Sequence, residues 1–310
     1  MKTASAANFV AAILLAASFF MLGSCSSMRM PPENHDLQAL DNPDIIERGR
    51  YLVYGPAHCA ACHGEPEREN EMRQGTEIRL SGGRSFDLGP LGTIVAPNIT
   101  SDAADGIGAL SDETLIRALR YGIARDGRPL APFMPFAGMA DDDLRAILSF
   151  LRSLPPVAAT APPSDLSWLG AFGIKFLLDP HDPTTPPPSS FAPARTAEYG
   201  RYLAYSVANC HDCHTLRSRL TGAFIGAPFA GGMQMKETGG TFLPPNLTPI
   251  ATGIMHDRTE QEFIQHFRLR GRDQTGSPMP WSAFARMTDT DLGAIYQYLI
   301  TLPPTETPDA

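Results

Sequence analysis

The sequence is short of positive charge: 25 Lys and Arg residues stand against 33 Asp and Glu residues, a formal net charge of −8 over 310 residues. Nucleic-acid binding does not fit this balance, because it depends on neutralising phosphates with Lys and Arg. An acidic surface either steers a partner that carries a basic docking patch or simply keeps the protein soluble. Both interpretations stay open.

Cysteine is scarce as well. Four of the five cysteines lie in two short stretches, Cys59-Ala60-Ala61-Cys62-His63 and Cys210-His211-Asp212-Cys213-His214. Only Cys25 remains, so no pair is left for a structural disulfide. A zinc site would need both Cys pairs to converge. They lie about 150 residues apart, in separate repeats, and each is followed at once by His, which disfavours zinc.

One uncharged apolar run, residues 4–22, follows Lys2 in the layout of a secretory leader. It ends in Leu22-Gly23-Ser24-Cys25, which is similar to the lipobox of bacterial lipoproteins, where the cysteine is acylated. We therefore predict a signal peptide over residues 1–25, acylation at Cys25 and a tether over 26–41. An uncleaved signal anchor is the alternative, and a cleaved leader with a free thiol is a third. The first two place the body on the periplasmic side of a bacterial membrane.

Cys-x-x-Cys-His is the attachment signature of c-type haem. Two thiols three residues apart on one helical turn reach the two vinyl groups of a porphyrin, and the following His supplies the proximal ligand to iron. The two stretches therefore predict two covalent haem c groups. The attachment residues are Cys59, Cys62, Cys210 and Cys213, and the proximal ligands are His63 and His214.

Further matches recur at nearly constant offsets. The stretch 47–52 returns at 198–203, an offset of 151, and Pro97-Asn98-Ile99-Thr100 returns as Pro245-Asn246-Leu247-Thr248, an offset of 148. Such self-similarity predicts two copies of one small all-α domain. We place them at residues 42–156 and 195–304, joined by a proline-rich linker over 157–194 and followed by a tail over 305–310. Within the linker, Trp168, Phe172 and Phe176 share one face of a short apolar helix. We expect this helix to pack across both domains, with a docking surface as the alternative.

The sixth iron ligand must be chosen among 12 methionines. Met134 and Met279 occupy matching places in the repeat, and each is followed by proline, which stiffens the loop that would hold a weak thioether ligand. Met139 and Met287 also match each other, but each precedes the final helix of its repeat, where a hydrophobic staple explains it. We predict Met134 and Met279 as ligands. His256 and His266 offer a bis-His alternative, although neither has a counterpart in the first repeat. We expect His58 and His211 to be exposed.

A ligating His normally donates its second ring N–H to a carbonyl or carboxylate. Pro97 and Pro245 are candidates because their motif lies between the two predicted ligands in each repeat, although Pro-Asn is also a common turn signal. Arg50, Arg84 and Arg201 are candidates to pair with haem propionates.

These motifs resemble the c-type cytochrome subunits of periplasmic and membrane-bound dehydrogenases for alcohols, aldehydes and gluconate. The resemblance rests on residues 59–63, 96–100, 106–108 and 134–135, and on 210–215, 245–248 and 279–280 in the second repeat. It implies two tandem cytochrome c domains of class I type, His/Met ligation, and Pro97 and Pro245 as the carbonyl partners of the ligating histidines. Many such subunits carry three haem domains, whereas this chain carries two motifs.

The resulting prediction is a dihaem electron carrier between a periplasmic or membrane dehydrogenase and a respiratory-chain acceptor, either a cytochrome or oxidase or a quinone-linked protein. The alternative is a catalytic dihaem enzyme, either peroxidase-like or thiosulfate-oxidising. A peroxidase needs one iron with a displaceable ligand, and the thiosulfate type uses a distal Cys. Neither requirement matches two equivalent methionine loops and a chain with no spare cysteine besides Cys25.

Overall fold

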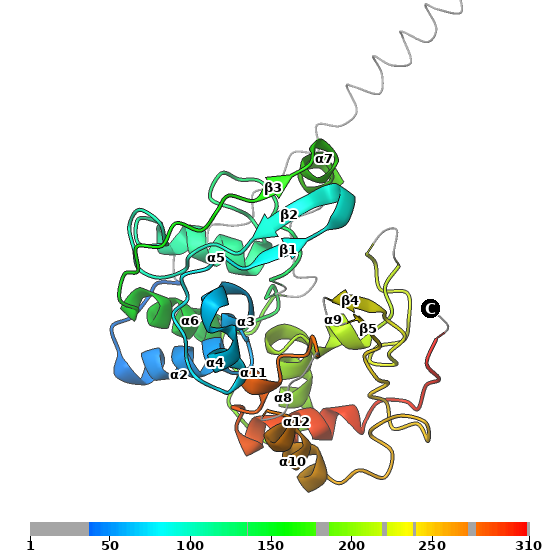
Figure 1. Ribbon diagram of the computed structural model, residues 1–310. Coiled ribbons are helices and arrows are strands. Elements are labelled where there is room, and N and C mark those ends of the chain that lie inside the picture. Colours follow the sequence, from blue (N-terminus) through cyan, green and yellow to red (C-terminus); the bar gives the residue numbers. More distant parts are fainter. Residues whose placement is uncertain are drawn as a thin grey trace, which may run out of the picture. The chain divides into compact units, whose positions relative to one another are not determined.

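The computed structural model describes residues 37–134, 136–177, 186–218, 222–237, 240–271 and 277–308, all within one compact unit (Figure 1). The predicted leader, the lipobox and Cys25 lie outside the described residues, as does Pro135. In the part of the chain that the structure describes, none of the helices has the length and apolar character needed to cross a bilayer.

The first half contains short helices and a small sheet. Its elements are α2 (Pro43–Tyr54), α3 (Ala60–His63), η1 (Pro66–Arg68), α4 (Glu69–Arg73), β1 (Ser85–Asp87), η2 (Gly89–Leu91), β2 (Gly92–Val95), α5 (Asp112–Tyr121) and α6 (Asp141–Ser153). Capping residues fix several of the helix starts. Asn42 Oδ1 accepts from the backbone N–H of Asp44, and Ser111 Oγ accepts from that of Thr114, each satisfying an orphan donor.

The linker contributes β3 (Asp165–Leu166) and α7 (Trp168–Leu177). The second half then repeats the order of the first. Its elements are α8 (Ala197–Tyr202), the π-helical turn η3 (Leu203–Val207), α9 (Cys210–His214), β4 (Met235–Glu237), β5 (Gly240–Phe242), α10 (Glu260–Arg270), α11 (Trp281–Phe284) and α12 (Asp289–Leu299). Thr288 caps the last helix, since its Oγ1 accepts from the Asp291 N–H at 3.1 Å.

In each half the first and last helices cross at a glycine. A Cβ on Gly49 of α2 would lie 1.9 Å from the Ala146 carbonyl oxygen of α6. A Cβ on Gly200 of α8 would lie 1.8 Å from the Ala294 oxygen of α12. Only glycine permits this approach, which accounts for its presence inside a helix despite the entropic cost. The crossing brings the first and last helices of each half into close contact.

The fold is mostly helical, but the all-α prediction omits two small antiparallel sheets. In the first, β2 pairs with β1 (Phe86 opposite Ile94) and with β3 (Thr93 opposite Asp165). The second pairs β4 with β5. Each hairpin lies between the attachment helix and the Pro-Asn-x-Thr motif of its half. Strands of two to four residues give too short an alternation to be read from a sequence.

The two halves hold each other through reciprocal hydrogen bonds. Tyr51 Oη of α2 donates to the Asp291 carboxylate and accepts from the Thr288 N–H at the start of α12. Tyr202 Oη of α8, the counterpart of Tyr51, donates to Asp143 Oδ2 at 2.6 Å and accepts from the Ala140 N–H at the start of α6. The same patch on each half thus binds the other, as in the isologous interface of a two-fold dimer.

Two segments differ from the sequence-based expectations. Residues 37–40, assigned to a free tether, dock on the first half, where the Leu40 N–H donates to Ser149 Oγ at 2.9 Å. The packing described for α7 is with η2 and β3, which does not match a helix packed across both halves. Trp168 is 81% exposed.

Candidate functional site

The two Cys-x-x-Cys-His motifs form short helices, α3 and α9, which follow the first helix of each half. The residue before each motif adopts the left-handed conformation, with φ of 41° at His58 and 52° at Asn209. Few residues other than glycine enter this region, so its recurrence at both sites marks a turn of fixed geometry. This turn redirects the chain into the attachment helix in both halves.

The imidazole of each motif is held by a proline carbonyl. His63 Nδ1 lies 2.8 Å from the Pro97 oxygen, and His214 Nδ1 lies 2.8 Å from the Pro245 oxygen. Because a carbonyl only accepts, Nδ1 must carry the proton, and in a neutral ring Nε2 then keeps its lone pair. Burial lowers the pKa of both histidines, which favours this neutral form. Each ring therefore offers Nε2 as a ligand in a fixed orientation.

In the first half, a glycine allows the Pro97 carbonyl to approach the His63 ring. Gly82 has φ of 72°, and its N–H donates to the His63 carbonyl at 2.8 Å. A Cβ at this position would lie 2.4 Å from the Pro97 carbonyl carbon. Gly231 has φ of 74° and donates in the same way to His214. A side chain at either glycine would push the carbonyl away from its histidine.

An asparagine turn fixes the carbonyl from the other side. Asn98 Oδ1 accepts from the N–H and the hydroxyl of Thr100 at 2.9 and 2.7 Å, an Asx turn. Asn98 Nδ2 donates to the Val157 carbonyl at 2.8 Å, and the Val157 N–H donates to Thr100 Oγ1. The first residue assigned to the linker thus supports the site.

The second half repeats this clamp. Asn246 Oδ1 accepts from the N–H and the hydroxyl of Thr248 at 2.8 and 2.7 Å. Asn246 Nδ2 donates to the Thr305 carbonyl at 2.9 Å, and Thr305 lies in the segment assigned to the tail. The clamp residues Asn98 and Asn246 could have been found from the sequence, because they recur at the same offset as the prolines.

The methionines of the repeat separate into two environments. Met134 and Met279 are partly exposed and pack on the edge of the core, whereas Met139 and Met287 are 0% and 2% exposed. Thioethers buried in the core are explained by packing alone. Met279 is held by a short turn in which its carbonyl accepts from the Trp281 N–H at 2.8 Å. The carbonyl of Met134 accepts in the same way from the Phe136 N–H at 3.0 Å.

None of the four motif cysteines is paired in a disulfide. Burial raises the pKa of Cys59 and of Cys210 to about 12, and that of Cys213 to about 11. Such thiols stay protonated near neutral pH, whereas zinc ligation and disulfide exchange use thiolates. Among the described residues, no group of three or more His, Cys, Asp or Glu side chains is placed to hold a metal ion.

Buried arginine donors test whether the residues fit a haem. Arg84 Nε is buried without a protein acceptor, although the same guanidinium pairs with Glu69 at 3.0 Å. Arg217, which closely follows the second motif in the chain, also has a buried and unpaired Nε, while its Nη2 pairs with Asp212 at 3.0 Å. Both guanidinium groups lie near the second cysteine of a motif, since each opposes the rise in that thiol's pKa. A further acceptor near each motif, such as a propionate, would satisfy these donors, so the residues fit the group.

The other arginine candidates have different partners: Arg50 pairs with Glu77 at 2.8 Å, and Arg201 lies over the Tyr205 ring. The prediction that His58 and His211 are exposed is wrong. His58 packs edge-on against Phe284 of the other half, with ring centroids 5.5 Å apart. The His211 side chain is 13% exposed and stacks on the Tyr205 ring at 4.6 Å.

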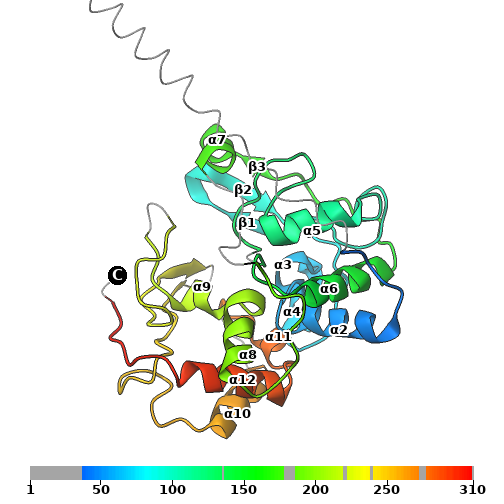
Figure 2. The ribbon, with the colours of Figure 1, turned by 180° about the vertical axis from the view of Figure 1, so that it is seen from behind.

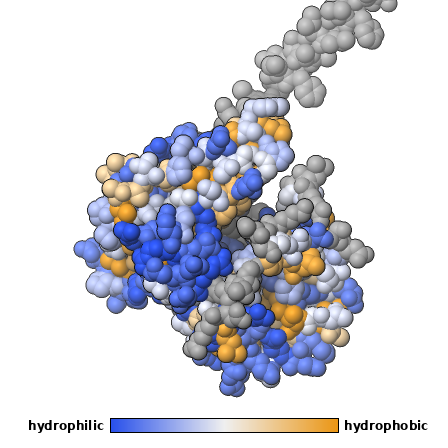
Figure 3. Space-filling view, viewed as in Figure 1, coloured by the Kyte–Doolittle hydropathy of each residue, from blue (hydrophilic) through white to orange (hydrophobic). Residues whose placement is uncertain are grey.

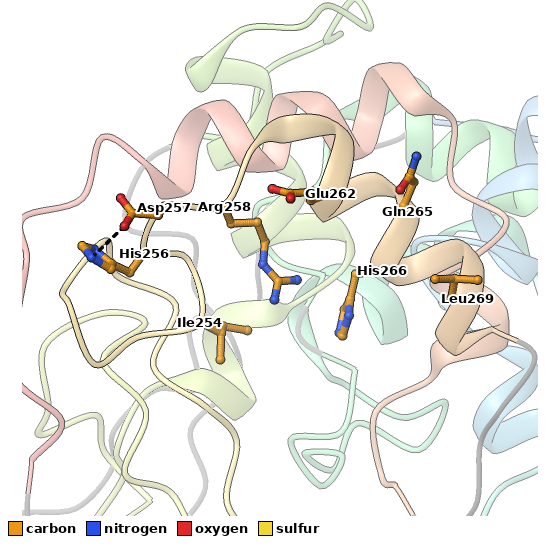
Figure 4. Close-up of a pocket in the computed structure, with 8 residues that line it drawn as sticks. All are labelled: Ile254, His256, Asp257, Arg258, Glu262, Gln265, His266 and Leu269. Atoms are coloured by element: carbon orange, nitrogen blue, oxygen red, sulfur yellow. Dashed lines mark ion pairs between the residues drawn. The ribbon is translucent and has the colours of Figure 1, made fainter.

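The two remaining histidine candidates line a separate pocket on α10 and the loop before it (Figure 4). His256 pairs with Asp257 at 3.2 Å and its side chain is 46% exposed. His266 lines the pocket together with Arg258, and its ring packs edge-on against Trp281. His214 and Met279 do not line this pocket. The bis-His alternative therefore receives no support from it.

Comparison with known proteins agrees with this geometry. Residues 46–155 match the cytochrome c family. The chain is 28% identical to the fructose dehydrogenase cytochrome subunit of Gluconobacter japonicus over 83% of this chain and 52% of the relative. It is 33% identical to the cytochrome c subunit of a quinone alcohol dehydrogenase from Gluconobacter oxydans, over 84% and 55%. It is also 29% identical to a diheme cytochrome c-type protein of Cereibacter sphaeroides, over 82% and 85%. The chain thus spans about half the length of the two dehydrogenase subunits.

The asparagine clamp generates a prediction. Asn98→Ala removes the Asx turn and leaves the buried Thr100 and the partly buried Val157 carbonyl without this partner, so we expect the free energy of unfolding in urea to fall by about 1–3 kcal/mol. The loosened carbonyl should bind the His63 N–H less well, make the imidazole a less basic ligand and raise the reduction potential of a haem bound by His63.

Asn70→Ala, a change at an exposed position of α4, is the control and should alter neither quantity. Identical stability and potential in the two variants would show that the clamp does not hold the carbonyl.

Proposed function

We propose that the protein is a dihaem c-type cytochrome. Its residues 46–155 match the cytochrome c family, and the chain is similar to the cytochrome c subunits of dehydrogenases. It would carry single electrons between a periplasmic or membrane dehydrogenase and a respiratory-chain acceptor. The observation that supports it most is the recurrence of one arrangement: in both halves the histidine after Cys-x-x-Cys bonds a proline carbonyl at 2.8 Å.

Each half would hold its haem with its own residues. Cys59 and Cys62 would form the thioethers of the first, and Cys210 and Cys213 those of the second. His63 and His214 would ligate iron through Nε2, which the carbonyl bond leaves with its lone pair. Bound haem c supplies an iron that changes between ferrous and ferric states by one electron.

Met134 and Met279 would occupy the sixth positions, and their partly exposed setting supports them over the two core methionines. Thioether ligation favours the ferrous state and holds the potential high, while the carbonyl bond makes the imidazole more basic and opposes this effect. With both positions filled, substrate would find no open iron. No feature of the described residues favours the peroxidase-like or thiosulfate-oxidising alternative.

The domain division is part of the proposal. Residues 42–156 and 195–304 would be two cytochrome c domains of class I type that arose by duplication. The matching helix crossings at Gly49 and Gly200 support this, as do the matching clamps at Asn98 and Asn246. The reciprocal tyrosine bonds join the two domains into one unit.

We extend the proposal to the location of the protein. The leader-like run and the lipobox-like stretch support acylation of Cys25, which would hold the protein on the periplasmic side of a bacterial membrane by a lipid anchor. The dehydrogenase partner rests on the names of the relatives. A Cys25→Ser variant that still sediments with membranes would refute the anchor.

The ligand assignment provides the test of the function. Met134→Ala and Met279→Ala should each remove about half of the near-infrared sulfur-to-iron absorption of the oxidised protein. Each should also open one iron to cyanide and lower that haem's potential, because Met/His ligation raises it.

Met139→Leu and Met287→Leu conserve volume in the core and should leave the band unchanged. A band that survives at full strength in an alanine variant removes that methionine from the site. A native protein that binds cyanide at once would favour a catalytic enzyme instead.

A further inference from the structure

The helix of the linker presents large apolar side chains to solvent. Trp168 is 81% exposed, Leu169 44% and Phe172 50%. The backbone of α7 is fixed on its inner side, where Ser167 Oγ donates to the Pro90 carbonyl at 2.8 Å and a Cβ on Gly170 would lie 2.1 Å from the Leu91 oxygen. These contacts hold the backbone of α7 in place, while the side chains of Trp168, Leu169 and Phe172 remain exposed to solvent.

This apolar area continues toward the first candidate haem site. Leu91 of η2 is 40% exposed and lies directly under α7. On β1, the Phe86 ring packs at 5.8 Å against Phe133, which is 50% exposed and precedes Met134. We call the five exposed residues Leu91, Phe133, Trp168, Leu169 and Phe172 the α7 surface.

The α7 surface is attached to the framework of that site. Strand β2 pairs with β3, the strand that precedes α7, and is closely followed by Pro97, whose carbonyl accepts from the His63 ring N–H. Figures 1 and 2 both place β1, β2, β3 and α7 together at one end of the unit, and Figure 3 shows apolar residues on the visible face there. A protein seated on this end would contact Phe133, the residue that precedes Met134 in the first half.

We propose that the α7 surface is the docking site for the catalytic subunit of a dehydrogenase, so that electrons enter at the first half. This inference rests on the proposed function and names the surface through which it operates. The relatives supply the class of partner, because their names describe cytochrome subunits of fructose, alcohol and gluconate dehydrogenases, and a subunit needs an interface. Tryptophan is enriched in interface hot spots, and phenylalanine is enriched in interfaces generally, so exposed Trp168 and Phe172 suit a protein contact.

The charges around the surface favour a protein over a lipid bilayer. Two carboxylates, Asp87 on β1 and Asp165 on β3, are exposed at the ends of the strands under α7. Helices that lie on anionic membranes carry several Lys or Arg residues on their polar face, whereas α7 contains a single basic residue in ten. The matching partner face would have an apolar pocket with a basic rim, which also agrees with the net charge of −8 of this chain.

Photo-crosslinking of the full-length holoprotein tests the proposal. Trp168→4-benzoylphenylalanine in membranes of the source organism should yield, on irradiation, an adduct whose second component is a dehydrogenase catalytic subunit. Leu269→4-benzoylphenylalanine, at an equally apolar and exposed position of α10 (68% exposed), is the control and should yield no such adduct. An adduct with lipid, with a second copy of this chain, or with no component at all overturns the proposal.

Kinetics with the captured, purified dehydrogenase then separate docking from electron transfer. A Trp168→Ser, Phe172→Ser variant should be reduced by the dehydrogenase and its substrate at least about tenfold more slowly than the wild type, which corresponds to about 1.4 kcal/mol. Reduction by ascorbate, and the rate of a Leu269→Ser variant, should not change. Equal rates in both variants overturn the docking site. A crosslink without any haem reduction by the dehydrogenase would instead refute the proposed electron transfer while leaving the docking surface standing.

Discussion

The hydrogen bond from His63 to the Pro97 carbonyl, with its twin between His214 and Pro245, is the constraint on which both sites depend. A carbonyl partner decides which ring nitrogen keeps the proton, and thereby which nitrogen can bind iron. Orientation of the ring follows from the same bond. The carbonyl must therefore stand in one place, and a left-handed glycine on one side and an asparagine turn on the other hold it there. Even the segments after the last helices serve this purpose, through Val157 and Thr305.

A second level of organisation joins the two halves. Tyr51 and Tyr202 each reach from a first helix to the amino terminus of the last helix in the other half. Their acceptors, Asp291 and Asp143, are 1% and 6% exposed, so loss of either tyrosine would leave a buried acceptor short of a donor. The two matching halves thus share an interface of the kind that two identical subunits would form. His58 takes part as well, because its ring touches Phe284 of the other half beside the first attachment helix.

Much of this could be predicted from the sequence where local chemistry decides the outcome. The two Cys-x-x-Cys-His stretches and the helix starts at Ser111 and Thr288 each follow from residues near one another in the chain. The repeat offsets then identified Pro97 and Pro245 as candidates. Partners distant in sequence could not be predicted: nothing local shows that Asn246 meets Thr305 or that Tyr51 meets Asp291.

The burial of individual side chains was the other property that could not be predicted from the sequence. His211 has polar neighbours in the chain and was expected outside, yet Tyr205 and Phe224 cover it. Trp168 belongs to an apolar stretch that was expected to pack across both halves, yet α7 packs on η2 and β3 and leaves this side chain 81% exposed. In both cases the number of faces that neighbouring elements cover decides the result, and a periodic pattern carries no information about that number.

The central claim is that each half carries one covalent haem on its own motif. Intact-mass measurement under denaturing conditions tests it most directly, because thioether-bound haem stays on the chain. The wild type should carry two haem masses, whereas the Cys59→Ala, Cys62→Ala and the Cys210→Ala, Cys213→Ala double variants should each carry no more than one. A wild-type protein with fewer than two covalent haems, or a double variant that retains both, would contradict the account.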